Sequence, residues 1–338
     1  MLELGPDNAL AYLRSIGQLG SEPARVEPLG WGVSNVVLRV DTSDRRFVLK
    51  QSRPQLRTRD AWFSDLSRVY REQEVMQVLY PLLPPGVVPE VLFSDRPNYV
   101  FAMSHAPLEA RVWKESLLAG EVDLALAESV GRVLGRMHES TAQQRHLIEP
   151  FSDHTVFVQL RVDPFYRRVQ ERCPDVAEPV ASLIEQLLTV QEALCHGDYS
   201  PKNILAHGDG FTLVDYETAH LGDPTMDLGF FLSHLMLKAI KRHAERERYF
   251  DLTRTFWRGY GSEVLFRSLP ELMRRGIGHF GLCVLARIDG TSPVDYLTEE
   301  PLRDAARWLG RRVLRERPSD WEQVLALADP LLSDLGRP

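Results

Sequence analysis

The chain has 338 residues, of which 44% are hydrophobic and 26% charged, a composition typical of a globular protein long enough for two lobes. Lys and Arg number 40 against 47 Asp and Glu, which gives a formal net charge of −7. This acidic balance argues against general nucleic-acid binding, which requires a basic surface. We find no signal peptide and no apolar run long enough to span a bilayer, so we expect no membrane association and a cytoplasmic location. No disulfide framework is expected from three widely spaced cysteines, Cys173, Cys195 and Cys283.

The first part of the chain alternates helical and strand-like patterns. In chain order we expect a helix, a strand pair, a second helix and another strand pair, over residues 7–19, 36–40 and 47–49, 63–83, and 87–93 and 99–103. Pro107 then ends regular strand pairing and indicates a linker.

From residue 121 onward the hydrophobic pattern is helical. Helices are predicted over residues 122–141, 179–192, 227–240, 246–261, 269–287, 299–315 and 319–332. Residues 150–170 mix aromatic and basic side chains without a clear period, and their acid and Arg side chains could meet a substrate. We therefore expect an α+β protein, with residues 1–104 forming a small sheet-based lobe and residues 105–338 a larger, mostly helical lobe.

Residues 195–223 contain the largest group of polar side chains that could take part in catalysis or metal binding. Ile204–Ala206 and Phe211–Val214 flank an Asp-Gly turn, which is a strong signal for a β-hairpin. Asn203 precedes the first run and Asp215 follows the second, so antiparallel pairing would bring them together at the open end. Asp198 lies in the loop that leads to the same end. These oxygen ligands suit a hard cation, although each acid alone would also fit a metal-free hairpin with a polar loop.

The same stretch has the spacing of a kinase catalytic loop. HGDYSPKN matches H-x-D-x-x-x-x-N, and Asp215-Tyr216-Glu217 stands where protein kinases have D-F-G. With the following GDPTMDLGFF, the sequence resembles the aminoglycoside phosphotransferase and choline kinase superfamily of small-molecule kinases, with some features of methylthioribose kinases. The resemblance implies a bilobal protein-kinase-like fold. It also implies transfer of the γ-phosphate of ATP, with Mg²⁺, to a hydroxyl of a small molecule such as a sugar, an aminoglycoside or an amino alcohol.

The resemblance assigns roles to individual residues. Asp198 would be the catalytic base, Asn203 and Asp215 the metal ligands, and Glu217 a further metal or substrate contact. Lys50, at the end of FVLK, would contact the nucleotide phosphates and pair with Glu72, with Glu74 as the alternative. An exposed strand lysine is the other interpretation of Lys50. The remaining nucleotide contacts would come from a glycine-containing loop and from the backbone of the linker, that is, from Gly30, Gly32, Ser34 and Asn35, and from Met103, Ser104 and Ala106.

The acceptor would lie near Asp198, with Arg287 and Asp289 as further contacts. Arg287 stands where methylthioribose kinases have an Arg pair, but Ala286 precedes it here, so only one member is present. A salt bridge between Arg287 and Asp289 is the alternative. Asp227 would brace the catalytic loop or cap its helix, and His138 is expected to be a satisfied core histidine.

Two other interpretations remain open. A protein kinase would have H-R-D, D-F-G and A-P-E segments, yet only eleven residues separate Asp215 from Asp227, which leaves little room for an activation loop. A nucleotide-binding pseudokinase that acts as an interaction module is the second. The absence of G-x-x-x-x-G-K-[ST] excludes a P-loop kinase.

Overall fold

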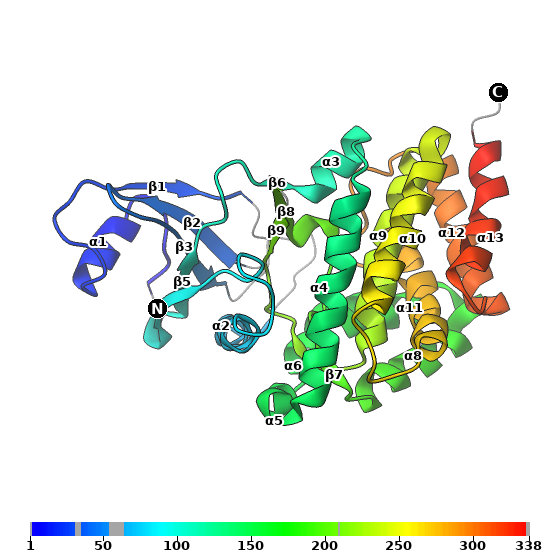
Figure 1. Ribbon diagram of the computed structural model, residues 1–338, viewed down its shortest axis with the longest axis horizontal. Helices are drawn as coiled ribbons and strands as arrows, with labels where there is room; N and C mark the ends of the chain where they lie inside the picture. The colour runs from blue at the N-terminus through cyan, green and yellow to red at the C-terminus, as the bar shows by residue number, and fades with distance from the viewer. Residues whose placement is uncertain (1, 31–34, 54–63, 209, 336–338) are drawn as a thin grey trace. The chain divides into compact units, whose positions relative to one another are not determined.

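The computed structural model describes residues 2–30, 35–53, 64–208 and 210–335 (Figure 1). The chain divides into two compact units. The first comprises Met1–Glu109 with Thr212–Thr218, and the second comprises Ala110–Phe211 with Ala219–Pro338. An antiparallel sheet with helices forms the first unit, and helices dominate the second. The predicted α+β class, with a sheet-based lobe and a helical lobe, is therefore confirmed.

A five-stranded antiparallel sheet forms the first unit, with strand order β1-β2-β3-β5-β4. The β2–β3 hairpin pairs Asn35 with Ser52 and Asp41 with Arg46. The elements of this unit are α1 (Ala9–Ser15), β1 (Arg25–Pro28), β2 (Asn35–Asp41), β3 (Arg46–Ser52), α2 (Arg68–Leu79), β4 (Val91–Asp95), a 3₁₀ turn (Arg96–Asn98) and β5 (Val100–Ser104).

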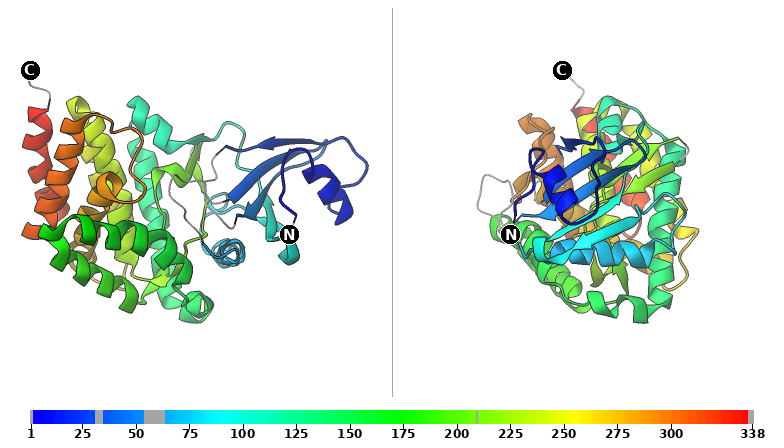
Figure 2. Two further views of the ribbon diagram at one scale, coloured as in Figure 1. Left: turned by 180° about the vertical axis from the view of Figure 1, so that it is seen from behind. Right: turned by 90° about the vertical axis from the view of Figure 1, so that its left-hand side faces the viewer.

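Side-chain alternation along β3 sends neighbouring residues to opposite faces of the sheet. Phe47 and Leu49 belong to an apolar cluster that includes Tyr12 of α1. Lys50 lies on the other face, where it pairs with Glu72 of α2. Figure 2 shows α1, in dark blue, beside the strands of this sheet. The alternation thus gives an apolar face against α1 and places Lys50 on the opposite face, against α2.

The second unit contains most of the helices. They are α3 (Trp113–Ala119), α4 (Leu124–Gln143), α5 (Arg145–Ile148), α6 (Thr155–Phe157), a π-helix (Val158–Arg167), α7 (Arg168–Arg172), α8 (Ala177–Thr189), α9 (Pro224–Lys241), α10 (Arg246–Gly261), α11 (Leu269–Asp289), α12 (Glu300–Glu316) and α13 (Trp321–Asp334), with 3₁₀ turns at Glu149–Phe151, Pro174–Val176, Pro201–Asn203 and His243–Glu245.

Short strands accompany these helices. They are β6 (Arg111–Val112), β7 (Ala193–Cys195), β8 (Ile204–His207), β9 (Gly210–Leu213) and β10 (His220–Gly222). Strands β7 and β10 pair antiparallel, and β8 lies between β6 and β9 in a small sheet. The two runs that flank the predicted turn are therefore neighbouring strands, while Asp209 in the turn itself lies outside the described residues.

Helix α9 is buried on every side. All residues from Pro224 to Ile240 are buried, as its nearly continuous apolar sequence predicts. It packs against α10 and α11, and Figure 1 shows α4, α9 and α10 side by side. Glycines permit the close approach of these helices. A Cβ atom at Gly131 of α4 would lie 2.1 Å from the carbonyl oxygen of Phe256 in α10, so no larger residue fits without moving a backbone.

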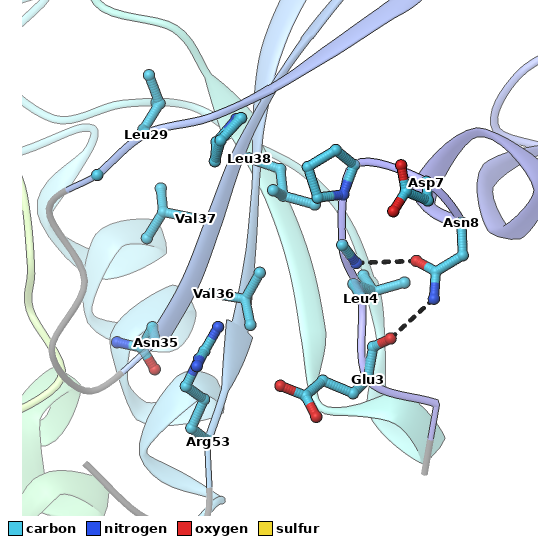
Figure 3. A pocket seen from close by; sticks show the side chains of 14 residues that line it. Glu3, Leu4, Asp7, Asn8, Leu29, Asn35, Val36, Val37, Leu38 and Arg53 are labelled. Atoms are coloured by element: carbon cyan, nitrogen blue, oxygen red, sulfur yellow. Dashed lines mark hydrogen bonds between the residues drawn. The ribbon is translucent and has the colours of Figure 1, made fainter. Parts of the chain in front are cut away.

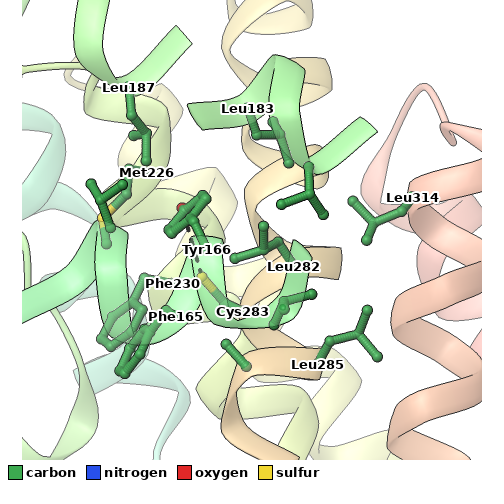
Figure 4. Packing of buried hydrophobic residues seen from close by; sticks show 14 of the residues in the cluster. Phe165, Tyr166, Leu183, Leu187, Met226, Phe230, Leu282, Cys283, Leu285 and Leu314 are labelled. Atoms are coloured by element: carbon green, nitrogen blue, oxygen red, sulfur yellow. Dashed lines mark hydrogen bonds between the residues drawn. The ribbon is translucent and has the colours of Figure 1, made fainter. Parts of the chain in front are cut away.

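An apolar cluster joins the π-helix, α8, α9 and α11 (Figure 4). Phe165 of the π-helix stacks on Phe230 of α9 with ring centroids 6.0 Å apart. Leu183 of α8 and Leu285 of α11 belong to the same cluster. This packing fixes the irregular π-helix against regular helices, because its apolar side chains are buried between them.

Several predicted boundaries differ from the observed ones, among them those of α9, β4 and α2. Helix α9 starts at Pro224, not at Asp227, because Asp223 caps it by accepting a hydrogen bond from the Thr225 N–H at 2.9 Å, and proline suits the first helical position. Strand β4 starts at Val91 and not at residue 87, since Pro89 cannot donate to a ladder. Helix α2 ends at Leu79, four residues early; its predicted start at Phe63 lies outside the described residues.

In the described part of the chain, no helix combines the length and apolarity needed to cross a bilayer. Cys173, Cys195 and Cys283 are all buried and free, in agreement with the prediction from their odd number and wide spacing.

Candidate active site

Lys50 is a buried cation held by two carboxylates. Its Nζ lies 2.8 Å from Glu72 Oε1 and 2.7 Å from Asp215 Oδ1, and only 5% of the residue is exposed. Burial alone would lower the Lys50 pKa, but the charges of Asp215 and Glu72 outweigh burial and raise that pKa above its ordinary value. Glu74, the alternative partner, instead pairs with Arg96 at the surface. Lys50 is thus a permanently charged group rather than an exposed strand lysine.

Asp215 adopts a left-handed backbone conformation, with φ of 73°. This region is unfavourable for residues other than glycine, and strain of this kind is often found at functional sites. The next N–H, of Tyr216, donates to Glu72 Oε1 at 3.3 Å, and the N–H of Leu213 donates to the carbonyl of Val87 at 2.7 Å. These bonds hold the Asp215 carboxylate in place beside Lys50.

Glu217 is neutralised by a buried arginine that the sequence reasoning missed. Its Oε2 accepts hydrogen bonds from Asn35 Nδ2 at 2.8 Å and from Arg68 Nε at 3.1 Å. Arg68 is completely buried and also donates to the carbonyls of Asp65 and Arg53. A signal was available, since Arg68 lies four residues before Glu72 and therefore on the same face of α2. Asn35 and Glu217, predicted to serve nucleotide and metal, bind each other here.

Gly30 occupies a turn two residues after the end of β1 and lines a pocket of about 440 Å³ (Figure 3). Asn35, Val37 and Arg53 line the same pocket, together with residues of the N-terminal segment such as Leu4. The predicted nucleotide-loop residues Gly32 and Ser34 lie outside the described residues. Of the predicted loop, the structure therefore describes only its two ends, Gly30 and Asn35.

The predicted linker contacts follow the end of β5. Met103 is buried within the sheet, where it faces Val48 of β3. The Ser104 N–H donates to the carbonyl of Glu90 at 2.8 Å, and its hydroxyl accepts from the Glu90 N–H at 2.9 Å. Ala106 lies beyond the strand. Because the Ser104 N–H is already hydrogen-bonded to Glu90, the backbone groups of neighbouring residues would have to make the hydrogen bonds to a ligand.

Asp198 lies in the second unit, in the loop between β7 and the 3₁₀ turn at Pro201–Asn203, and is 3% exposed. Its two oxygens contact different cations: Oδ1 is 2.7 Å from Arg161 and Oδ2 is 2.8 Å from Lys202. Asn203 Nδ2 donates to both the backbone carbonyl and Oδ2 of Asp198, each at 2.9 Å. The predicted base is therefore a carboxylate held in one orientation by three side chains.

Asp227 braces the loop that carries Asp198. Its two oxygens accept hydrogen bonds from the N–H groups of His196, at 2.7 Å, and Gly197, at 2.8 Å. His138, fully buried, contacts Asp227 Oδ2 at 3.3 Å. Burial would raise the Asp227 pKa, but hydrogen bonding and charge from His138 and His196 outweigh it and lower that pKa. Asp227 thus binds the loop and does not cap α9, and His138 is a partnered core histidine.

Arg161 was not predicted individually. It comes from the π-helix, which contains Pro164, and this irregular winding explains the missing period in residues 150–170. Its Nε donates to the Gly197 carbonyl at 2.7 Å, in addition to the ion pair with Asp198. The only sequence signal was that aperiodic mixture of aromatic and basic residues.

Arg287 and Asp289 do not form the salt bridge considered as an alternative. Arg287 Nη1 donates to the carbonyl and hydroxyl of Ser292, whereas Asp289 accepts from Arg307 Nε at 3.0 and 3.1 Å. Burial lowers the Arg287 pKa, and the charge of Asp198 is among the groups that oppose this shift. The charge of the predicted base Asp198 therefore acts on the pKa of Arg287, while Asp289 forms an ion pair with Arg307.

The predicted metal ligands are oxygen donors of the kind that Mg²⁺ prefers. In the described residues, no group of three His, Cys, Asp or Glu side chains forms a preformed metal site. Mg²⁺ in phosphoryl-transfer enzymes is commonly held by one or two carboxylates together with substrate phosphates. Asp215 and the amide oxygen of Asn203 are suitable ligands. Glu217 is less suitable, because Arg68 and Asn35 already occupy its Oε2.

The chemistry of each unit is distinct. The first presents a buried ammonium group flanked by carboxylates, which can bind an anionic group such as a phosphate. The second presents a fixed carboxylate that can orient a hydroxyl and accept its proton.

Comparison with known proteins shows the family and the fold of the chain. The family model described as the phosphotransferase enzyme family matches residues 25–263. The methylthioribose kinase of Exiguobacterium sibiricum is 26% identical over 336 residues, covering 91% of this chain and 83% of that kinase. The methylthioribose kinase of Geobacillus thermodenitrificans is 24% identical and covers 87% and 88%, respectively.

Known structures share the fold at low sequence identity. A choline/ethanolamine kinase family protein from Mesorhizobium loti has a TM-score of 0.52 at 19% identity and covers 98% of this chain and 95% of its own. An amicoumacin kinase bound to AMP-PNP and Ca²⁺ has a TM-score of 0.54 at 15% identity, covering 94% and 96%. A macrolide 2′-phosphotransferase from Brachybacterium faecium has a TM-score of 0.51 at 18% identity, covering 98% and 99%.

Proposed function

The chain belongs to the phosphotransferase enzyme family, and from this premise we propose that it is an ATP- and Mg²⁺-dependent kinase that phosphorylates a hydroxyl group of a small molecule. The observation that carries the proposal is the buried Lys50, held between Glu72 and Asp215. A lysine in such a position binds nucleotide phosphates in kinases. Residues 1–104 would bind the nucleotide, and residues 105–338 would provide the catalytic loop and the acceptor site.

In this proposal Lys50 neutralises charge on the nucleotide phosphates, and Glu72 orients it. Glu72 is completely buried, so its pairing with Lys50 fixes the ammonium position with little freedom. The adenine would be held by backbone groups around Met103 and Ala106. The relative with bound AMP-PNP supports an adenine nucleotide as the phosphate donor.

Asp198 would orient the acceptor hydroxyl and accept its proton. Its ion pairs with Arg161 and Lys202 hold the carboxylate in one orientation, which suits a group that positions the acceptor hydroxyl and receives its proton during phosphoryl transfer. Asn203 and Asp215 would hold Mg²⁺, which when bound offsets the charge of the phosphates. Asp227 would keep the loop in position through the N–H groups of His196 and Gly197.

An assay of ADP formation in the presence of ATP and Mg²⁺ tests the proposal. The purified protein should release ADP only when a suitable hydroxyl compound is present, in a screen of sugars, sugar acids, sugar phosphates, aminoglycosides and amino alcohols. Phosphorylated product should appear in equal amount. Binding of ATP without turnover on any compound would favour the noncatalytic interaction module, and phosphorylation of a protein substrate instead would favour an atypical protein kinase.

A further inference from the structure

Five cationic side chains gather around the loop of Asp198 in the second unit. We call this group the cationic cluster, and its members are Lys114, Arg161, Lys202, Lys238 and Arg287. Arg161 and Arg287 both lie 5.6 Å from the centroid of the Phe165 ring. Lys238 and Lys114 lie 5.3 and 5.6 Å from the centroid of the Tyr296 ring. Residues from α3, the π-helix, α9 and α11 thus converge on one region.

Lys238 is the most unusual member of the cluster. It is 1% exposed, and its Nζ donates to the carbonyl of His234 at 3.0 Å. Within the described part of the chain, no carboxylate lies within salt-bridge distance of Lys238. Burial, together with the charges of Lys114 and Arg287, lowers its pKa well below the ordinary value. An unpaired buried lysine is costly, and this cost needs a functional reason.

Two polar atoms near Lys238 have no hydrogen-bond partner among the described residues. The Nε of Arg287 and the hydroxyl of Tyr296 are buried, and neither makes a hydrogen bond to any of the residues that the structure describes. Buried polar groups are nearly always satisfied, so each unsatisfied group calls for an explanation. The two donors and the Lys238 ammonium could be satisfied together by one acceptor-rich group, because all three can donate hydrogen bonds.

The charge balance specifies the kind of group. Among the described residues, the carboxylates that pair with the cluster are Asp198, which contacts Arg161 and Lys202, and Asp295, which contacts Lys114 at 3.2 Å and is largely exposed. In the described ranges, no carboxylate forms a salt bridge with Lys238 or Arg287. A cationic acceptor would be repelled by Arg287 and would lower the Lys238 pKa further, whereas an anionic group would attract Arg287 and favour the ammonium form of Lys238. This local excess contrasts with the chain's net charge of −7.

We infer that the acceptor carries an anionic group, a phosphate or a carboxylate, which binds Lys238, Arg287 and Tyr296 while its hydroxyl faces Asp198. This inference rests on the proposed kinase function and narrows its acceptor class to compounds such as sugar acids and sugar phosphates. The same chemistry would also suit a phosphate of the nucleotide, and the experiment must separate these two sources.

Calorimetric titration of inorganic phosphate into the nucleotide-free protein tests the site without turnover. Binding should weaken about tenfold or more in Lys238→Met, since a charge-assisted hydrogen bond of ordinary strength is lost. Tyr296→Phe, which removes only the hydroxyl, should weaken it by a smaller factor. Both variants should unfold at the same or a higher temperature than the wild type, because Tyr296→Phe removes an unsatisfied buried hydroxyl and Lys238→Met removes a buried amine that pairs with no carboxylate among the described residues.

The matched control is Lys241→Met, on the same helix. Lys241 is more exposed and pairs with Glu299 at 3.3 Å, so this variant should bind phosphate like the wild type. Absence of phosphate binding to the wild type, or equal binding by Lys238→Met, would overturn the inference. Displacement of phosphate by a saturating, non-hydrolysable ATP analogue would also overturn it, since the cluster would then serve the nucleotide.

A second experiment compares four six-carbon compounds as acceptors: glucose, gluconate, glucose 6-phosphate and glucosamine. ADP release should favour an anionic member, with glucosamine the poorest, and this preference should disappear in Lys238→Met while the KM for ATP stays unchanged. A preference for glucosamine or glucose would contradict the inference and leave the kinase proposal intact. Failure to bind ATP at all would refute the kinase proposal, and the phosphate titration would still decide whether the cluster binds an anion.

Discussion

At Asp198, a change of one atom tests the proposed chemistry. Asp198→Asn keeps the size of the side chain but cannot accept the hydroxyl proton, so turnover should fall about 10²-fold or more. Affinity for a non-hydrolysable ATP analogue should change little, because Asp198 is not assigned to the nucleotide. Initial rates of ADP release and calorimetry would measure the two quantities.

The control for this substitution is Asp163→Asn. Asp163 is a half-exposed carboxylate of the π-helix that pairs with Arg167. Its loss should leave turnover unchanged, since surface ion pairs of this kind contribute little. Near-native turnover in Asp198→Asn would remove Asp198 from the role of base.

At Asp215, the backbone conformation guides the choice of variant. Asparagine tolerates positive φ better than other residues, so Asp215→Asn should preserve the local fold while removing the charge. Mg²⁺ should raise the affinity of the wild type for ATP. In the variant this Mg²⁺-dependent increase in affinity should be smaller by about tenfold or more, because a metal ligand has been lost. Titrations with and without Mg²⁺ would measure it, with the exposed Glu74→Gln as control. An equal Mg²⁺ effect in Asp215→Asn and wild type would contradict the metal assignment.

At the level of elements, close helix packing makes glycines structurally important in the second unit. Gly131→Ala would place a Cβ atom 2.1 Å from a backbone oxygen of α10, so α4 and α10 would have to separate. We expect a loss of about 1–3 kcal/mol in the free energy of unfolding, as for an overpacked core. Urea unfolding would measure this loss.

Gly278→Ala provides the comparison within α11. Its Cβ atom would meet only the flexible end of Leu183, at 3.0 Å, and alanine is the better helix former. Its stability should therefore stay near or slightly above that of the wild type. Equal effects of the two substitutions would show that helix packing at Gly131 is looser than described.

At the scale of the whole molecule, acid should unfold the second unit through its buried carboxylates. Asp223 receives hydrogen bonds from Gln186 and Arg275, the latter at 2.6 Å, and contacts His279. Burial would raise the Asp223 pKa, but the hydrogen bond and charge of His279 and the charge of Arg275 outweigh it and lower that pKa below its ordinary 3.8. Three helices, α8, α9 and α11, therefore depend on one ionised carboxylate.

The sign of the pH dependence follows from this depressed pKa. The stabilisation is fully present above the ordinary value of 3.8 and is lost as the pH falls through that value toward the folded-state pKa. Asp223→Asn keeps a good helix cap but leaves Arg275 poorly paired, so it should lose roughly 3 kcal/mol at pH 7. The difference from wild type should shrink below about pH 4.

Urea unfolding at pH 7, 5, 4 and 3 would follow this difference, with Asp304→Asn, a mostly exposed carboxylate, as control. A constant gap between Asp223→Asn and wild type over the whole range would contradict the assignment. The control should track the wild type at every pH.

The sequence by itself determined the fold class and most of the elements. Periodicity marked the helices because an apolar stripe must face a core, and the β2–β3 hairpin followed from two β-rich runs around a polar turn. The spacing of Asp198 and Asn203 determined their contact, since five residues of a tight loop keep the two side chains close. Lys50 and Glu72 could be matched because strand alternation and helix periodicity each specify a face.

Tertiary structure alone decided how these side chains are paired. Arg68 and Glu217 lie far apart in sequence and meet only because the segment after β9 joins the first unit. Arg161 reaches Asp198 from a π-helix, whose five-residue hydrogen bonding leaves no regular hydrophobic period. Lys238 lies near the end of α9, and its low exposure and lowered pKa arise in the folded chain, where α9 contacts α3 and α11. Local patterns record which face a residue occupies, whereas burial and charge pairing depend on which distant segments come to cover that face.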